Sequence, residues 1–207
     1  MKKLIVIVAS LLVAVSAHAQ FGVVAGITSS KSDIKSAVAD VQGKNITQYH
    51  VGVTYKLSLG NMVAIQPAIL YNVKGTEFDF TNVGSTKLDM KTGFIEVPVQ
   101  LQVGFGLGDL ARIYGFAEPF VGYAITNAAT LDGNAIKDLD WDNIKSRLEY
   151  GVGLGVGVEL IKHVQVAVKY FWNMGDLYNG DVTFAGVTKT IAESKASGIA
   201  ASVAILF

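Results

Sequence analysis

Residues 148–160, LEYGVGLGVGVEL, alternate strictly between large apolar side chains and small or acidic ones. Leucine, tyrosine or valine takes every even position, whereas glycine or glutamate takes every odd position. A period of two is the side-chain period of a β-strand, so this stretch predicts a long strand with one apolar face and one face of small residues. What each face contacts decides the fold.

Seven other segments alternate in the same way, and no stretch after residue 20 keeps a helical period. In one of them Val63, Ile65, Ile69, Tyr71 and Val73 share the apolar face. The seven expected strands cover residues 20–29, 46–58, 62–75, 88–105, 111–127, 164–173 and 195–207. Their links are short at 59–61, at 106–110 and around 162, and long and polar at 30–45, 76–87, 128–146 and 175–194. Short turns at one end and long loops at the other are typical of an outer-membrane barrel.

The composition bears on which face meets water. The chain has 207 residues, of which 51% are hydrophobic and only 16% are charged. A soluble barrel would bury the apolar face and place the other face in water, where strands normally carry charged or bulky polar groups. Here the second face of two strands, at 148–160 and 195–207, carries mostly glycine, alanine and serine, which instead suits the narrow interior of an eight-stranded barrel. We therefore expect the apolar face to meet lipid and the small residues to line the lumen.

The inward face also carries charge. Eight charged residues, four of each sign, fall on it: Lys56, Lys74, Glu96, Arg112, Glu118, Glu149, Glu159 and Lys169. Charges removed from bulk water persist when they are paired and hydrogen-bonded, so we predict a lumenal ion network with Glu96, Glu118 and Lys169 near mid-depth. Two interpretations stay open: a structural plug, which we favour because eight strands enclose only side chains, or a selective water path or proton relay.

The first 19 residues have the layout of a secretory signal peptide. Lys2 and Lys3 precede an apolar run over 4–15, and Ala17-His18-Ala19 gives the small-x-small pattern of a cleavage site. We expect cleavage after Ala19, which leaves residues 20–207 as the barrel domain. The run is shorter than the ~20 residues of a transmembrane helix. The chain has no cysteine, and its 17 basic and 17 acidic residues balance, so neither a disulfide framework nor nucleic-acid binding is indicated.

Three further features fit a membrane barrel with local irregularities. Aromatic residues gather toward the long-loop ends of the strands, which predicts an interfacial girdle of Tyr49, Tyr71, Tyr123, Tyr150, Tyr170 and Trp172. The last strand ends with Val203, Ile205 and the terminal Phe207 on its apolar face. Prolines lie inside three of the expected strands, at positions 67, 98 and 119. Because a closed barrel has no edge to accommodate a proline, we expect bulges or kinks there.

Candidate catalytic and metal sites are sparse. A lipid-modifying enzyme would need a histidine and a serine in contact, but His163 falls in a short turn and no serine is indicated beside His50, which we take as a lumenal polar residue. Asp138, Asp140, Asp142 and Glu149 approach the spacing of a calcium loop, although an asparagine stands where glycine belongs. The alternative is an acidic solvated loop with Asx turns.

Several short motifs resemble a known family. They are Phe94–Val99 (FIEVPV), 115–123 (GFAEPFVGY), 149–160 (EYGVGLGVGVEL) and 166–170 (VAVKY). The chain resembles the small outer-membrane β-barrel proteins of the Bacteroidetes type, often called PorT-like. This resemblance implies an outer-membrane location, and it marks Phe207, with Val203 and Ile205, as the signal that the barrel-assembly machinery reads. The archetype of the family is linked to the secretion of surface proteins.

Together these observations predict an all-β protein, an eight-stranded antiparallel up-and-down transmembrane β-barrel of OmpX/OmpA-like architecture. We expect a monomer in the outer membrane of a Gram-negative bacterium, with both termini periplasmic, no cofactor and no enzymatic activity. Its role would be a structural or interaction scaffold that displays four extracellular loops. Expected partners are outer-membrane lipid, the assembly machinery during biogenesis, and an unknown extracellular or periplasmic partner. The alternatives are a narrow pore, an accessory factor for secretion or adhesion, and a lipid-modifying enzyme.

Overall fold

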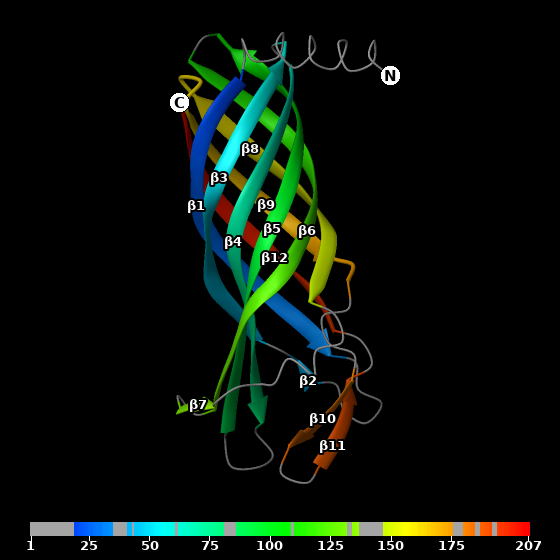
Figure 1. Ribbon diagram of the computed structural model, residues 1–207. Helices are drawn as coiled ribbons and strands as arrows, with labels where there is room; N and C mark the ends of the chain where they lie inside the picture. The colour runs from blue at the N-terminus through cyan, green and yellow to red at the C-terminus, as the bar shows by residue number, and fades with distance from the viewer. Residues whose placement is uncertain are drawn as a thin grey trace, which may run out of the picture.

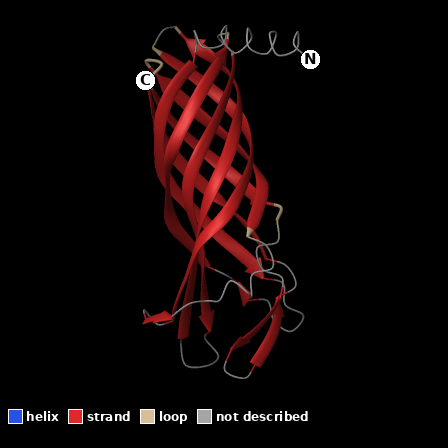
Figure 2. Cartoon of the chain, in the orientation of Figure 1, coloured by secondary structure: helices blue, strands red, loops and turns tan. Residues whose placement is uncertain are grey.

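The computed structural model describes the barrel almost completely. The described residues are 19–34, 41–42, 44–60, 62–80, 86–108, 110–131, 134–136, 147–175, 180–184, 187–191 and 194–207. Their regular elements are all strands (Figure 2). No helix among them is long and apolar enough to cross a membrane. Residues 1–18 of the predicted signal peptide and the three aspartates of the candidate calcium loop lie outside the described residues, whereas Ala19 begins the first strand.

Eight long strands form the barrel wall. They are β1 (Ala19–Ile34), β3 (Lys44–Leu59), β4 (Val63–Phe80), β5 (Thr86–Leu107), β6 (Ala111–Leu131), β8 (Leu148–Leu160), β9 (Val164–Asn173) and β12 (Ser194–Leu206). Each pairs antiparallel with its neighbour along this order, and β12 pairs with β1 from Gly22↔Leu206 to Ile34↔Ser194, which closes the sheet. The predicted closed, eight-stranded antiparallel barrel is therefore confirmed.

The two ends of the barrel differ. The short connections, the start of β1 and the C-terminus share one end, where the Phe207 amide donates to the Phe21 carbonyl at 2.7 Å (Figure 1). In the β8–β9 turn two residues that are not glycine, Ile161 and Lys162, adopt positive φ of 46° and 63°. The opposite end carries four short strands: β2 (Val41–Gln42), β7 (Asn134–Ile136), β10 (Gly180–Phe184) and β11 (Val187–Ile191).

The strands are longer at that opposite end than the sequence suggests. The expected polar link at 76–87 is mostly strand, because β4 continues to Phe80 and β5 begins at Thr86. Residues 30–34 and 44–45 also belong to strands. Polar side chains were interpreted as loop, but a strand that leaves the lipid band no longer needs an apolar face. The predicted loop boundaries were therefore wrong, although the order of the strands was right.

The two faces of the wall are arranged as the alternation predicts. Val156 on the outer face is 65% exposed, whereas Tyr114 on the inner face is 2% exposed. Glycine is required opposite such large inner side chains, since a Cβ on Gly157 would lie 2.4 Å from Cζ of Tyr114. Val73 is the exception: it was expected on the lipid face but is 8% exposed. It pairs with Gly93, next to a register shift that bends the wall locally.

The expectation that the prolines cause register slips is wrong. The pairing keeps one register on both sides of each proline, at Pro67, Pro98 and Pro119. The register shifts lie elsewhere, between Asn45 and His50 in β3 and between Gly93 and Phe94 in β5. Glycine accommodates a bulge easily because it lacks a Cβ.

Each proline instead interrupts one ladder for two residues. A proline has no N–H, so the carbonyl opposite it loses its ladder partner. In register, the carbonyls opposite the three prolines belong to Tyr55, Ala68 and Val99. At the first interruption a side chain adds a hydrogen bond, because the Thr54 hydroxyl donates to the Pro67 carbonyl at 3.0 Å. These interruptions form a diagonal across β3, β4, β5 and β6.

Candidate functional site

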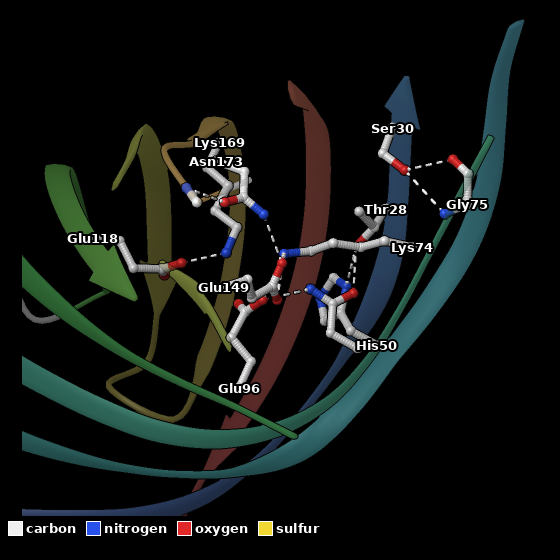
Figure 3. Close-up of polar contacts among 12 residues, drawn as sticks. Thr28, Ser30, His50, Lys74, Gly75, Glu96, Glu118, Glu149, Lys169 and Asn173 are labelled. Atoms are coloured by element: carbon white, nitrogen blue, oxygen red, sulfur yellow. Dashed lines mark hydrogen bonds and ion pairs between the residues drawn. The ribbon is translucent and has the colours of Figure 1, made fainter. Parts of the chain in front are cut away.

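The lumen toward the loop end contains a buried cluster centred on Lys74. Its ammonium donates to Glu96 Oε2 at 2.9 Å and to Glu149 Oε1 and Oε2 at 2.9 and 3.0 Å (Figure 3). The two carboxylate side chains are 1% and 0% exposed. Two acids therefore share one cation in a water-poor interior, where the interaction between charges is much stronger than at a surface.

Aromatic rings and amides complete this cluster. The Lys74 ammonium lies 5.5, 4.6 and 5.1 Å from the ring centres of Phe94, Phe120 and Phe171. A cation over an aromatic face is attracted by the negative π-face of the ring. Two asparagines also donate to these carboxylates: Asn72 donates to Glu96 at 3.1 Å and Asn173 to Glu149 at 2.8 Å.

A hydroxyl–histidine chain continues from this cluster toward the middle of the barrel. Thr28 donates to Asn72 Oδ1 at 3.2 Å and lies 2.9 Å from His50 Nδ1, and His50 Nε2 lies 2.9 Å from Ser202 Oγ. The sequence indicated no serine beside His50, and that expectation is wrong. The pair is brought together by β1 pairing with both β3 and β12, a closure that local patterns do not reveal.

At mid-depth, Lys169 forms an ion pair with Glu118. Glu118 also accepts a hydrogen bond from Gln100 at 2.7 Å, and Gln102 donates to Gln100 at 3.0 Å and to Gln66 at 2.8 Å. The sequence interpretation singled out the charged residues and passed over these glutamines. The available signal was their place on the inward face of β4 and β5, which the alternation of residues within each strand defines.

The turn end of the lumen has a third cluster. Lys56 is paired with Glu159, which also accepts a hydrogen bond from Gln165 at 2.8 Å. Arg112 lies 3.8 Å from the same carboxylate and donates to Gln102 and to the Met62 carbonyl at 3.0 and 3.1 Å. Charged residues from β3, β4, β5, β6, β8 and β9 thus form one lumenal polar column from Asn173 to Lys56.

The column fills the lumen. The cavity between the His50 chain and the Lys169–Glu118 pair has a volume of about 30 Å³, enough for water but not for a solute. Within the described residues, no three histidine, aspartate or glutamate side chains are grouped to bind a metal. Glu149, the described member of the candidate calcium set, points into the lumen and contacts Lys74.

The outer face carries the aromatic residues that were predicted to form a girdle. Five are 37–53% exposed and one, Tyr71, is half-buried; the set comprises Tyr49, Tyr71, Tyr123, Tyr150, Tyr170 and Trp172. The rings of Tyr170 and Trp172 stack edge to face with centroids 4.7 Å apart. Val203, Ile205 and Phe207 are also on this face, with Phe207 68% exposed.

A closed antiparallel barrel with an apolar outer wall and an ion-paired lumen is the structure of an integral barrel protein of a membrane. The family model of the Outer membrane protein beta-barrel domain matches residues 15–179, and the chain belongs to this family. It is therefore an outer membrane β-barrel protein. No curated protein matches the chain.

Solved structures of small outer-membrane barrels are similar to this chain at low sequence identity. Neisserial surface protein A is 15% identical, covers 90% of this chain and 97% of its own, and superimposes with a TM-score of 0.46. Ail of Yersinia pestis, in complex with the heparin analogue sucrose octasulfate, is 13% identical over 92% and 99%, with a TM-score of 0.44. OprG of Pseudomonas aeruginosa is 12% identical over 91% and 95%, with a TM-score of 0.49.

Proposed function

We propose that the protein is a non-enzymatic, non-conducting scaffold that presents its loop end at the cell surface for interaction with another molecule. The lumenal polar column carries this proposal. Three ion-paired clusters occupy successive depths of the lumen, and their side chains are 12% exposed or less. Breaking a buried pair by removing one partner is strongly unfavourable, so the column acts as a plug rather than as a set of mobile gates.

The His50–Ser202 pair does not argue for an enzyme. His50 is 3% exposed, and each of its ring nitrogens already contacts a hydroxyl. The adjoining cavity of about 30 Å³ has no room for an ester or an acyl chain beside the serine. This pair therefore fits a structural hydrogen-bond chain.

Bilayer conductance tests the plug. We expect the purified barrel in a planar bilayer to show no single-channel steps, and the Glu118→Lys variant to lose stability without opening a selective path. The Lys91→Glu variant, which changes a charge at the exposed position 91, is the matched control. Steady unitary currents in the unmodified protein whose ion selectivity reverses with Glu118→Lys would establish the narrow pore instead.

The remaining parts of the proposal concern export and orientation. Residues 1–19 would be removed as a signal peptide, and the end that holds the C-terminus would face the periplasm, with Val203, Ile205 and Phe207 read during assembly. The aromatic residues of the outer wall would lie at the lipid interface, as tyrosine and tryptophan do in membrane barrels. N-terminal sequencing of the mature protein and protease accessibility in whole cells test the cleavage and the orientation.

The interaction role rests on the loop end, which the strands carry beyond the lipid band. β5 has 22 residues, whereas a tilted strand of about 10 residues already crosses that band. Crosslinking in intact cells, followed by purification, tests for a partner. We expect a crosslinked species from the intact protein that is lost when residues 178–193 are deleted, while heat-modifiable gel mobility shows that the shortened barrel still folds. Crosslinking that survives the deletion would place the interaction elsewhere.

A further inference from the structure

A cavity in the middle of the lumen divides the polar column in two. It is lined by residues from seven of the eight barrel strands. They include His50 and Ser202 from the half nearer the loop end, and Gln100 and Lys169 from the half nearer the turn end. Across this cavity, no direct hydrogen bond between protein groups joins the two halves among the described residues.

The polar groups around the cavity have unused hydrogen-bonding capacity. Among the residues that the structure describes, the Lys169 ammonium has one hydrogen-bond partner, Glu118, for its three donors. Gln66 uses its carbonyl oxygen, and Gln165 uses its amide nitrogen, so the other atom of each side chain has no protein partner there. Lys169, Gln66 and Gln165 are 9%, 5% and 3% exposed. Leaving such buried groups unpaired costs about 1–3 kcal/mol each, so they require a partner.

The wall beside the cavity adds one more acceptor. Ala68 and Pro98 both line the cavity, and they are opposite each other where the β4–β5 ladder skips two pairs. The Ala68 carbonyl therefore has no ladder donor, because Pro98 has no N–H. In a wall that faces lipid on its outer side, a donor for this carbonyl must come from within the lumen.

We propose that this cavity is a binding site for two ordered water molecules, which join the His50–Ser202 group to the Lys169–Glu118 pair. A volume of about 30 Å³ fits two waters, since one needs roughly 10–15 Å³ by this measure. Water supplies both donors and acceptors, which the mixed set of an ammonium, an amide nitrogen, an amide oxygen and a carbonyl demands. The two halves of the column thereby become one hydrogen-bonded structure across the barrel.

Water-to-protein NMR on the labelled barrel in detergent micelles tests this site. We expect cross-relaxation peaks between long-lived water and the methyl groups of Ala167 and Ala204, which line the cavity. The methyl group of Ala25, on the exposed outer face, should show none. Absence of the water peaks at both lining methyl groups in the unmodified protein would overturn the proposal.

A pair of matched substitutions supplies an independent measurement. Ala167→Val fills the cavity, whereas Ala201→Val adds the same atoms at an outward-facing position of β12. We expect Ala167→Val to abolish the water peaks and to lower the folding equilibrium constant about tenfold in urea titrations, because buried groups lose their water partners. Ala201→Val should keep the peaks. A cavity that excludes water would instead make Ala167→Val more stable, since the added methyl groups would fill apolar space. If Ala167→Val does not fold, the NMR measurement on the unmodified protein still decides the outcome.

Discussion

Replacing Lys74 by methionine removes the cation on which two buried carboxylates depend. Methionine keeps a chain of similar length and can remain among Phe94, Phe120 and Phe171. Glu96 and Glu149 would then face each other without the ammonium that now lies 2.9 Å from each. We expect Lys74→Met to be among the most destabilising single substitutions in the lumen.

The magnitude follows from burial. Removing one partner of a buried ion pair costs about 3–5 kcal/mol. Here the three side chains are 5%, 1% and 0% exposed, so solvent does not screen the remaining charges. We therefore expect a loss near the middle of that range, about 4 kcal/mol. Adding Glu149→Gln to Lys74→Met removes the repulsion and should recover roughly half of that loss.

Equilibrium unfolding in urea measures these free energies, with the heat-modifiable gel mobility of the barrel in detergent as the readout of the folded fraction. A double-mutant cycle with Lys74→Met, Glu149→Gln and the combined variant isolates the coupling between the two residues. Lys91→Met, at an exposed position, is the control and should change the free energy of unfolding by less than about 0.5 kcal/mol. A loss below about 1 kcal/mol for Lys74→Met, or zero coupling in the cycle, would refute the plug as a set of mutually dependent pairs.

Three further substitutions test the wall and its turn in the same urea titration. Gly157→Ala should destabilise by about 1–3 kcal/mol, because its Cβ would lie 2.4 Å from the buried Tyr114 ring, whereas Gly115→Ala, whose Cβ would meet its nearest neighbour at 3.9 Å, should be neutral. Equal effects at the two glycines would contradict the assignment of faces. Replacing Ile161-Lys162 by Asn-Gly should raise the free energy of unfolding by about 1–3 kcal/mol. Both residues adopt a left-handed φ, which strains the β-branched Ile161 most. An unchanged urea midpoint would mean that the turn is unstrained. Thr54→Val should cost about 1 kcal/mol by removing the donor to the Pro67 carbonyl, and the neighbouring Ser58→Ala variant serves as its control.

The parity of the wall could be predicted from the sequence because burial in a barrel follows a local rule. Each inward charge from Lys56 to Lys169 is on the lumenal face in the structure, and most outward aliphatic residues are exposed. The exceptions are Val73, which is buried, and a few half-buried positions on other strands, such as Leu57 and Val152. Alternation within one strand suffices for such assignments, since successive side chains point to opposite faces. The strand count follows from the same alternation.

Long-range pairing could not be predicted in this way. The contact of His50 with Ser202 spans 152 residues and depends on the closure between β1 and β12. The choice of Glu96 and Glu149 as joint partners of Lys74 depends on strand tilt and stagger, which no single segment encodes. Bulges were expected at prolines because proline removes a donor. The β5–β6 pairing instead keeps its register at the prolines and shifts between Gly93 and Phe94.

The unequal strand lengths make the loop-end rim oblique. β4, β5 and β6 have 18, 22 and 21 residues, whereas β9 on the other side has 10. The link between Phe80 and Thr86 therefore begins farthest from the body of the barrel, and the link after β9 begins much nearer to it. The links at this end therefore leave the barrel wall at different heights, which makes them unequal as epitopes for an antibody or a phage.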